Sequence, residues 1–254
     1  MSRDYIIHTP DEIERIRVAA AMTGKARDLI ADSVRPGMST KELDLIAGEI
    51  ITSMGGKCAF LGYAGFPGNI CISVNDEVVH GIGDPNRFIL KGDLVKVDVG
   101  VAFNGGIGDT ARTVYVGDAP CPADEQKLMD VTRDALEAGI KAALPGNHIR
   151  DISAAIQQVA KKNGIAIVRD FVGHGCGVKL HEPPEVPNYV TPMRGPRLQP
   201  GMVLAIEPMF NLGTYKVYVE RNDWTVRTRD GKKSAHFEHM VLITNDQPEV
   251  LTRA

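Results

Sequence analysis

The feature that most constrains the fold is an internal repeat with a spacing of 109 residues. The segment 22–37 (MTGKARDLIADSVRPG) aligns without gaps on 131–146 (VTRDALEAGIKAALPG), and each copy ends in Pro-Gly. A second helix is predicted after each Pro-Gly, near 39–53 and 148–162, and each of these helices is followed by a glycine. The repeat predicts two halves that each begin with two helices.

The same spacing continues into the segments that follow the helices. Residues 91–98 (KGDLVKVD) align on 200–207 (PGMVLAIE), which places Asp98 and Glu207 at equivalent positions because 207 − 98 = 109. Chance similarity of two helix–loop–helix segments is the alternative, but a constant offset across three separate features argues against it. We expect an α/β (α+β) fold in which two halves pack about a pseudo-twofold axis. The strands would join into one sheet or form facing sheets.

The composition is that of an ordinary globular protein. The chain has 254 residues, 43% of them hydrophobic and 24% charged, with a formal net charge of −3. This balance gives no electrostatic reason to expect a nucleic acid or an anionic membrane as partner. No apolar stretch has the length of a signal peptide or approaches the roughly 20 residues needed to span a bilayer. The 4 cysteines include no Cys-x-x-Cys pair, and we expect reduced thiols in the cytoplasm.

Two aspartates are predicted to meet in a β-hairpin. Residues 93–103 alternate as a strand, and Asn104-Gly105 is a strong signal for a two-residue turn. With such a turn, paired residue numbers sum to 209, and Asp98 and Asp109 become diagonal neighbours on one face. A three-residue turn would spoil this parity unless a bulge restored it.

A pair of aspartates in a hairpin is more often solvated or paired with a cation than functional. Lys96 shares a face with Asp98 on a straight strand and could neutralise it. Arg112 points to the face opposite Asp109 and could not.

The second half of the chain adds three further candidate ligands. Glu207 lies in an apolar strand that ends at Pro208, and Glu238 lies in the apolar segment 236–244. His174 stands between two glycines, where the backbone can approach a ligand closely. Taken singly, each glutamate could pair with a buried arginine, and the histidine could be an ordinary loop residue.

Together these residues form a set of four carboxylates and one imidazole. Burying so much negative charge without a cation is prohibitively costly, and no cluster of lysine or arginine accompanies the set. Ligands of this kind suit Mn, Fe, Co or Zn, and five of them suit two divalent ions about 3.5–4 Å apart.

The residues that carry this chemistry resemble those of the type I methionine aminopeptidases. The resemblance extends from the first helix to Leu251 and includes the local contexts Val-His-Gly-Ile, Val-Asp-Val, Gly-Asp-Thr, Gly-His-Gly, Ile-Glu-Pro and Phe-Glu-His. Seven positions match in order: His80, Asp98, Asp109, His174, His181, Glu207 and Glu238.

The resemblance implies the pita-bread fold, in which two pseudo-twofold-related halves each have two helices packed on antiparallel strands. It also implies a dinuclear centre. Asp98 would bind one ion, His174 and Glu207 would hold the other, and Asp109 and Glu238 would bridge both, with a water or hydroxide between the ions. The ions would be Co, Mn, Fe, Zn or Ni.

The resemblance assigns the remaining functional residues to the substrate. His80 and His181 would contact the substrate and stabilise the tetrahedral intermediate, and Glu207 would also move a proton. The methionine side chain would occupy a narrow apolar slot, which suits an unbranched thioether, formed by Tyr63, Phe66, Cys71 and Trp224. Phe60 and Leu180 depart from the family pattern, which expects a small cysteine and an aromatic residue there.

The function implied is removal of the initiator methionine from nascent proteins, through attack of the metal-bridging hydroxide on the first peptide bond. The enzyme would be a cytoplasmic monomer that meets its substrates at the ribosome. Its single catalytic domain would span 1–254, with halves at approximately 12–120 and 121–250.

Three relatives with the same fold remain as alternatives. Aminopeptidase P and prolidase share the metal ligands but usually carry a large N-terminal domain, for which Asp98 lies too early. Type II methionine aminopeptidases have an insertion between the positions of His181 and Glu207, which here are separated by only 25 residues. A non-catalytic binding protein with this fold would have lost metal ligands, whereas all five are present.

Overall fold

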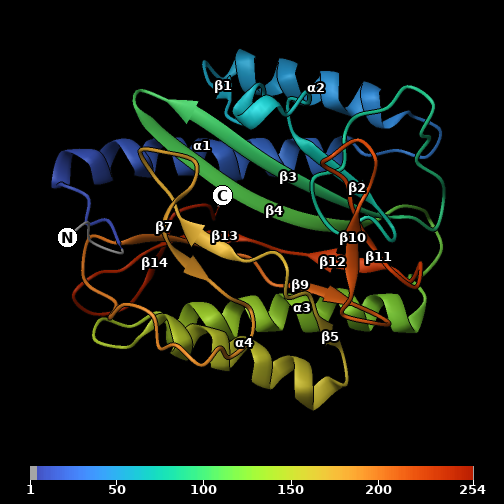
Figure 1. Ribbon diagram of the computed structural model, residues 1–254. Helices are drawn as coiled ribbons and strands as arrows, with labels where there is room; N and C mark the ends of the chain where they lie inside the picture. The colour runs from blue at the N-terminus through green and yellow to red at the C-terminus, as the bar shows by residue number, and fades with distance from the viewer. Residues whose placement is uncertain (1–4, 254) are drawn as a thin grey trace.

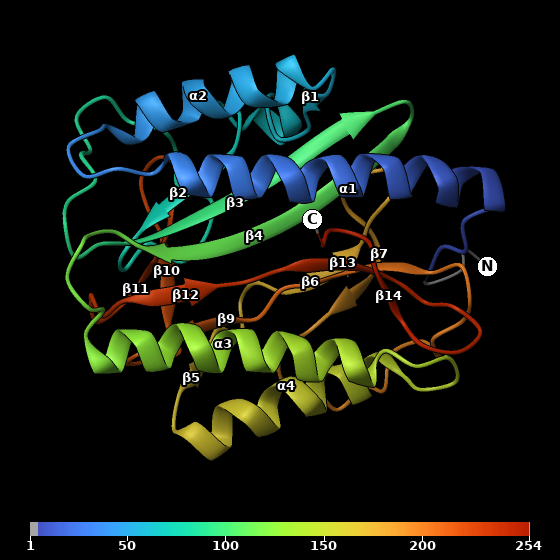
Figure 2. The same cartoon turned by 180° about the vertical axis from the view of Figure 1, so that it is seen from behind.

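The computed structural model describes residues 5–253, in which strands fill the space between two pairs of helices (Figure 1). Seen from behind, α1 and α3 run across the strands, with α2 and α4 farther out (Figure 2). The four helices are α1 (Pro10–Ser33), α2 (Thr40–Ser53), α3 (Ala123–Ala142) and α4 (Ile149–Asn163). Thr9 and Glu12 form a capping box at the start of α1, with Pro10 in the first turn.

The strands of the first half form one antiparallel sheet around a long hairpin. Strand β3 (Leu94–Phe103) pairs with β4 (Gly106–Tyr115) along one edge, and with β1 (Lys57–Cys58) and β2 (Cys71–Val74) along the other. A 3-10 turn, η1 (Tyr63–Gly65), lies between β1 and β2.

The strands of the second half form two antiparallel sheets and a separate hairpin. The five-stranded sheet has the order β14-β13-β8-β6-β7, the three-stranded sheet has the order β12-β9-β5, and β10 pairs with β11. These strands are β5 (Ala166–Ile167), β6 (Gly173–Gly175), β7 (Glu182–Val186), β8 (Val203–Ile206), β9 (Met209–Asn211), β10 (Val217–Val219), β11 (Val226–Thr228), β12 (Ser234–His236), β13 (His239–Leu242) and β14 (Glu249–Val250).

The internal repeat reappears in the backbone hydrogen bonds. The N–H of Gly37 donates to the carbonyl of Ile89 at 2.7 Å. At an offset of 109 residues, the N–H of Gly146 donates to the carbonyl of Leu198 at 2.9 Å. Gly37 and Gly146 also share a left-handed conformation, with φ of 92° and 91°. The predicted α/β fold with two related halves is therefore confirmed.

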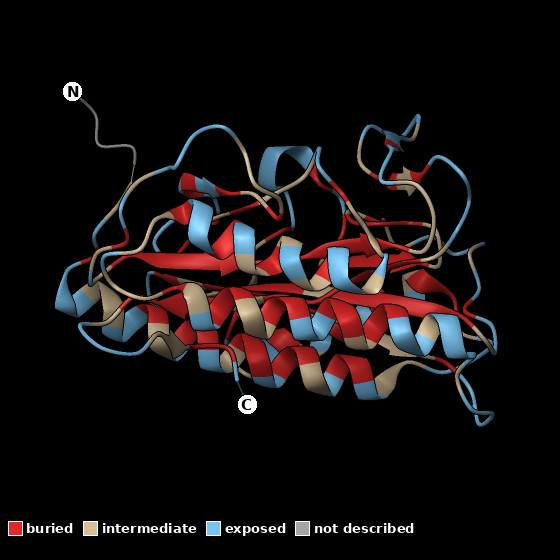
Figure 3. Ribbon diagram, turned by 90° about the horizontal axis from the view of Figure 1, so that it is seen from below, coloured by how far each residue is buried: buried red, intermediate tan, exposed pale blue. Residues whose placement is uncertain are grey.

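Each half has its own hydrophobic core. One cluster packs α1 and α2 against β2 and β3, and another packs α3 and α4 against β8 and β9. Coloured by burial, the helices are red toward the strands and pale blue toward solvent (Figure 3). Among the described residues, no helix combines the length and the apolar character needed to cross a membrane.

The β3–β4 hairpin has the predicted register. Phe103 pairs with Gly106 across a two-residue turn whose Asn104 and Gly105 both have positive φ, 48° and 78°. Gly100 consequently pairs with Asp109.

The hairpin presents its two faces to different neighbours. A side chain at Gly108 would lie only 2.7 Å from the carbonyl oxygen of Ala19, because α1 packs directly on that face of β4. Since strand residues alternate, Asp109 and its diagonal neighbour Asp98 point away from α1.

The segments that carry the two glutamates differ from prediction. Glu207 and Glu238 do not lie inside continuous strands, because β8 ends at Ile206 and β13 begins at His239. Pro208 has no N–H to donate, so the ladder is interrupted beside it. The N–H of Glu238 instead crosses to the first half and donates to the carbonyl of Ala111 at 3.0 Å.

The close contact between α1 and β4 yields a prediction about stability. We expect Gly108→Ala to lower the free energy of unfolding by about 1–3 kcal/mol, because the added methyl group overlaps the backbone of α1. Gly105→Ala is the comparison, since its methyl group would meet only the flexible end of Arg15, although its left-handed φ costs about 1–2 kcal/mol. Denaturant unfolding measures both, and an unchanged midpoint for Gly108→Ala would contradict the packing argument.

Candidate metal centre and active site

One cavity of about 170 Å³ collects the residues that the sequence singled out. Its walls come from both halves, because the first half supplies β2–β4 and the second half supplies β6 and the breaks at Glu207 and Glu238. The predicted site residues that line it are Tyr63, Phe66, Cys71, His80, Asp98, Asp109, His174, His181, Glu207, Trp224 and Glu238.

The carboxylates and His174 converge at the end of this cavity. The Nε2 atom of His174 lies 3.8 Å from Oδ2 of Asp109 and 3.4 Å from Oε1 of Glu207. Asp109, His174 and Glu238 each offer a ligand atom, and these three atoms lie within 4.8 Å of one another. Asp98 reaches the same cavity from the strand beside Asp109.

The backbone fixes which nitrogen of His174 faces the carboxylates. Its Nδ1 atom lies 2.9 Å from the carbonyl oxygen of Gly175, which can only accept a hydrogen bond. Nδ1 therefore carries the proton, and Nε2 has a free lone pair directed toward Asp109 and Glu207. This is the tautomer that a metal-binding histidine requires.

Burial perturbs the acids of the cluster strongly. It raises the pKa of Asp98 to about 7, and it raises the pKa of Asp109 and Glu238 well above their usual range. For Glu207 the pKa is also well above the usual value, first because of burial and then because of the negative charges of Asp109 and Asp98. Without a cation, these four groups cannot all be ionised near neutral pH.

Several oxygens of the cluster fit a metal ion because they lack other partners. Oδ1 of Asp98, Oδ1 of Asp109 and Oε1 of Glu238 are buried without a hydrogen-bond donor among the described residues. Buried carboxylate oxygens without donors are costly, and a divalent cation would satisfy them. The donor set of oxygens with one imidazole nitrogen suits transition-metal ions.

Two further histidines stand over the cluster. His181 lies beside His174, with ring centroids 4.1 Å apart, and its Nδ1 atom is 2.9 Å from the hydroxyl of Tyr63. His80 has a left-handed φ of 58° and packs edge-on against Phe171. Burial is the main cause that lowers the pKa of both histidines, to about 4 for His80, so both are neutral at pH 7.

An apolar slot adjoins these polar groups. Phe66 packs edge-on against Trp224, with ring centroids 5.1 Å apart, and burial raises the pKa of the Cys71 thiol, which keeps it neutral. Phe60 and Leu180 both line the slot. The ring of Phe60 fits because position 100 is glycine, where a Cβ atom would lie 2.4 Å from that ring.

Comparison with known proteins agrees with this geometry. The model of metallopeptidase family M24 matches residues 14–245. A methionine aminopeptidase of Clostridium perfringens is 48% identical over 248 residues, covering 97% of this chain and 98% of the relative. A methionine aminopeptidase 1 of Bacillus subtilis is 45% identical, covering 98% and 99%. The chain belongs to metallopeptidase family M24.

Solved structures place the fold in the same family. The crystal structure of a Thermotoga maritima methionine aminopeptidase matches with a TM-score of 0.94 and 40% identity, covering 98% of this chain and 100% of that one. A Pyrococcus furiosus prolidase matches with a TM-score of 0.76 at 24% identity, and only 66% of it is covered, so that likeness shows the fold alone. The resemblance inferred from the sequence is confirmed, and membership of M24 implies divalent metal ions.

The M24 cavity also contains residues that sequence reasoning missed. His236 is buried with both ring nitrogens lacking a hydrogen-bond donor or acceptor, and its Nε2 lies 3.7 Å from Oε2 of Glu207. Its position two residues before Glu238 was the available signal. Phe171 and Met209 also line the cavity, but nothing in their local sequence distinguishes them from core residues.

The raised acid pKa values predict that metal binding releases protons. At pH 7 the metal-free cluster retains protons that a divalent ion displaces, so affinity should increase as pH rises through 7 and fall as pH drops. His174, with its pKa lowered to about 4 mainly by burial, contributes none of these protons. Calorimetric titration with Mn²⁺ in two buffers of different ionisation enthalpy measures the release. We expect about one proton or more, and a buffer-independent enthalpy would refute the expectation.

Proposed function

We propose that this chain removes the N-terminal methionine from polypeptides by hydrolysing their first peptide bond with the help of two divalent metal ions. The observation that carries the proposal is one cavity in which four acidic side chains and His174 adjoin an apolar slot. The full-length similarity to methionine aminopeptidases supports the same conclusion.

The proposed metal ligands divide between the two halves. Asp98 binds one ion, His174 and Glu207 hold the other, and Asp109 and Glu238 bridge the two. Co, Mn, Fe, Zn and Ni are all compatible with this donor set. When bound, two such ions supply an activated water and polarise the scissile carbonyl.

The two neutral histidines are proposed to act on the substrate. If the Tyr63 hydroxyl donates to Nδ1 of His181, then Nε2 of His181 carries the proton and can donate it to the developing oxyanion. His80 contacts the substrate from the other side of the cavity. Glu207, whose pKa is raised by burial, holds a proton that can pass to the leaving amine.

The apolar slot is proposed to bind the methionine side chain. Tyr63, Phe66, Cys71 and Trp224 surround a space suited to an unbranched thioether, which makes favourable contacts with aromatic rings. A free substrate amine would ligate a metal ion, which explains why only the first residue is cleaved.

The proposal extends to the organisation and setting of the protein. Residues 1–254 form a single catalytic domain with halves at approximately 12–120 and 121–250. It acts as a monomer in the cytoplasm on nascent proteins at the ribosome, and any ribosome contact uses the surface of the catalytic domain.

Cleavage of two tripeptides with and without a chelator tests the activity. We expect hydrolysis of Met-Ala-Ser, loss of that activity on chelation and its recovery with Mn²⁺ or Co²⁺. Preference for Ala-Pro-Ser would instead indicate a proline-directed peptidase. Chelator-insensitive binding without turnover would indicate a non-catalytic protein of the same fold.

The hydrogen bond between Tyr63 and His181 provides a second prediction. We expect Tyr63→Phe to lower kcat/KM for Met-Ala-Ser by about 2- to 10-fold, because a lost hydrogen bond is worth about 0.5–1.5 kcal/mol. Tyr218→Phe is the control, because that ring packs beside Arg229 and does not line the cavity. Equal rates for the wild type and Tyr63→Phe would remove Tyr63 from the mechanism.

A further inference from the structure

A lysine is completely buried one row behind the carboxylates. Lys96 is 1% exposed and lies on β3, two residues before Asp98 and on the same face of the strand. Its neighbours in the sheet are Ser73 on β2 and Thr113 on β4. A buried lysine is costly, so its contacts require explanation.

The contacts of Lys96 join the two halves of the molecule. Its Nζ atom donates to the carbonyl oxygen of Asn75 at 2.7 Å and lies 3.3 Å from the carbonyl oxygen of Ser234. Asn75 belongs to the first half, and Ser234 begins β12 in the second half. The lysine makes no ion pair with Asp98, so it does not neutralise the metal ligands.

The two neighbours of Lys96 make connections of the same kind. The Oγ1 atom of Thr113 donates to the carbonyl of His236 at 2.7 Å and accepts from the N–H of His236 at 2.9 Å. The Oγ atom of Ser73 accepts from the N–H of Gly81 at 3.0 Å, beside His80. The row Ser73–Lys96–Thr113 therefore holds the segments that lead to Glu238 and His80.

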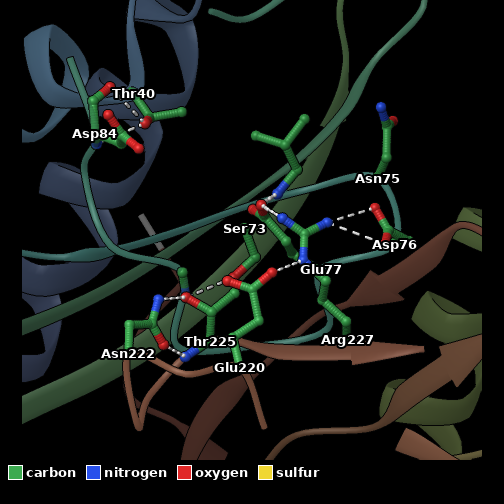
Figure 4. A network of polar contacts seen from close by, with 12 residues as sticks. Thr40, Ser73, Asn75, Asp76, Glu77, Asp84, Glu220, Asn222, Thr225 and Arg227 are labelled. Atoms are coloured by element: carbon green, nitrogen blue, oxygen red, sulfur yellow. Dashed lines mark hydrogen bonds and ion pairs between the residues drawn. The ribbon is translucent and has the colours of Figure 1, made fainter. Parts of the chain in front are cut away.

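The turn that contains Asn75 is also held from its other side. Arg227 donates to both carboxylate oxygens of Asp76, at 2.9 and 3.0 Å, and to Glu77 at 2.6 Å (Figure 4). The N–H of Ser234 donates to the carbonyl of Asn75 at 3.0 Å. With this turn fixed, removal of Lys96 would free β3 and β12 to move relative to each other.

We propose that Lys96 is a positioning residue, whose Nζ atom sets the distance between the first-half and second-half ligands of the metal centre. The proposal rests on the proposed function. It does not depend on protonation, because the amine and the ammonium both have at least two N–H donors. Burial is the main cause that lowers the pKa of Lys96 to about 7, and either form can bridge Asn75 and Ser234.

Replacement of Lys96 by methionine tests the proposal. Lys96→Met keeps a long apolar stem and removes the donors, whereas Lys57→Met changes an exposed lysine on the neighbouring strand β1. We expect Lys96→Met to weaken Mn²⁺ binding by calorimetry, and to lower kcat for Met-Ala-Ser, each by about 10- to 100-fold. Lys57→Met should leave both unchanged. Unchanged metal affinity in a folded Lys96→Met protein would overturn the proposal.

Chemical rescue provides a second, independent test. Lys96→Ala leaves a space lined by the carbonyl oxygens of Asn75 and Ser234, which a small amine can enter. We expect methylammonium chloride to restore Mn²⁺ affinity to Lys96→Ala in a saturable manner, while sodium chloride at equal ionic strength does not. No difference between the two salts would count against a bridging role, including when Lys96→Met fails to fold.

The calorimetric measurement separates this inference from the proposed function. If wild type binds Mn²⁺ but does not cleave Met-Ala-Ser, the proposed function fails. The comparison of Mn²⁺ affinity between wild type and Lys96→Met still decides whether Lys96 positions the ligands.

Discussion

The close approach of four acidic side chains is the constraint on which the rest of the structure depends. Asp98, Asp109, Glu207 and Glu238 line one cavity, and their raised pKa values express the cost of placing negative charges together away from water. Such an arrangement persists only where packing elsewhere opposes the repulsion. Each half has its own core of helices on strands, and hydrogen bonds from the row around Lys96 hold the halves together where their charges meet.

Much of this architecture could be predicted because its signals are local or periodic. The two-residue turn at Asn104-Gly105 determined the pairing of β3 with β4, and the pairing placed Asp98 and Asp109 on one face. The offset of 109 residues predicted two related halves, since equivalent sequences form equivalent turns, as at Gly37 and Gly146.

Other parts of the site could not be predicted because they depend on contacts between distant segments. The breaks at Glu207 and Glu238 arise where the ladder is interrupted beside Pro208 and the N–H of Glu238 bonds to the other half. The partner of Lys96 was also unpredictable. Strand alternation gives the face of a lysine, but the backbone carbonyls it reaches depend on how the halves dock. The slot residues were identified only through resemblance to a family.

The repeat also explains why a symmetric scaffold produces an asymmetric centre. Strand pairing gives Asp98 and Glu207 corresponding places, but the residue that faces Gly100 is Asp109, whereas the corresponding residue facing Met209 is His236. Substitutions in only one half have therefore given each side of the cavity a different mixture of oxygen and nitrogen donors. Two metal ions held there would experience different fields, with different affinities and different rates of exchange.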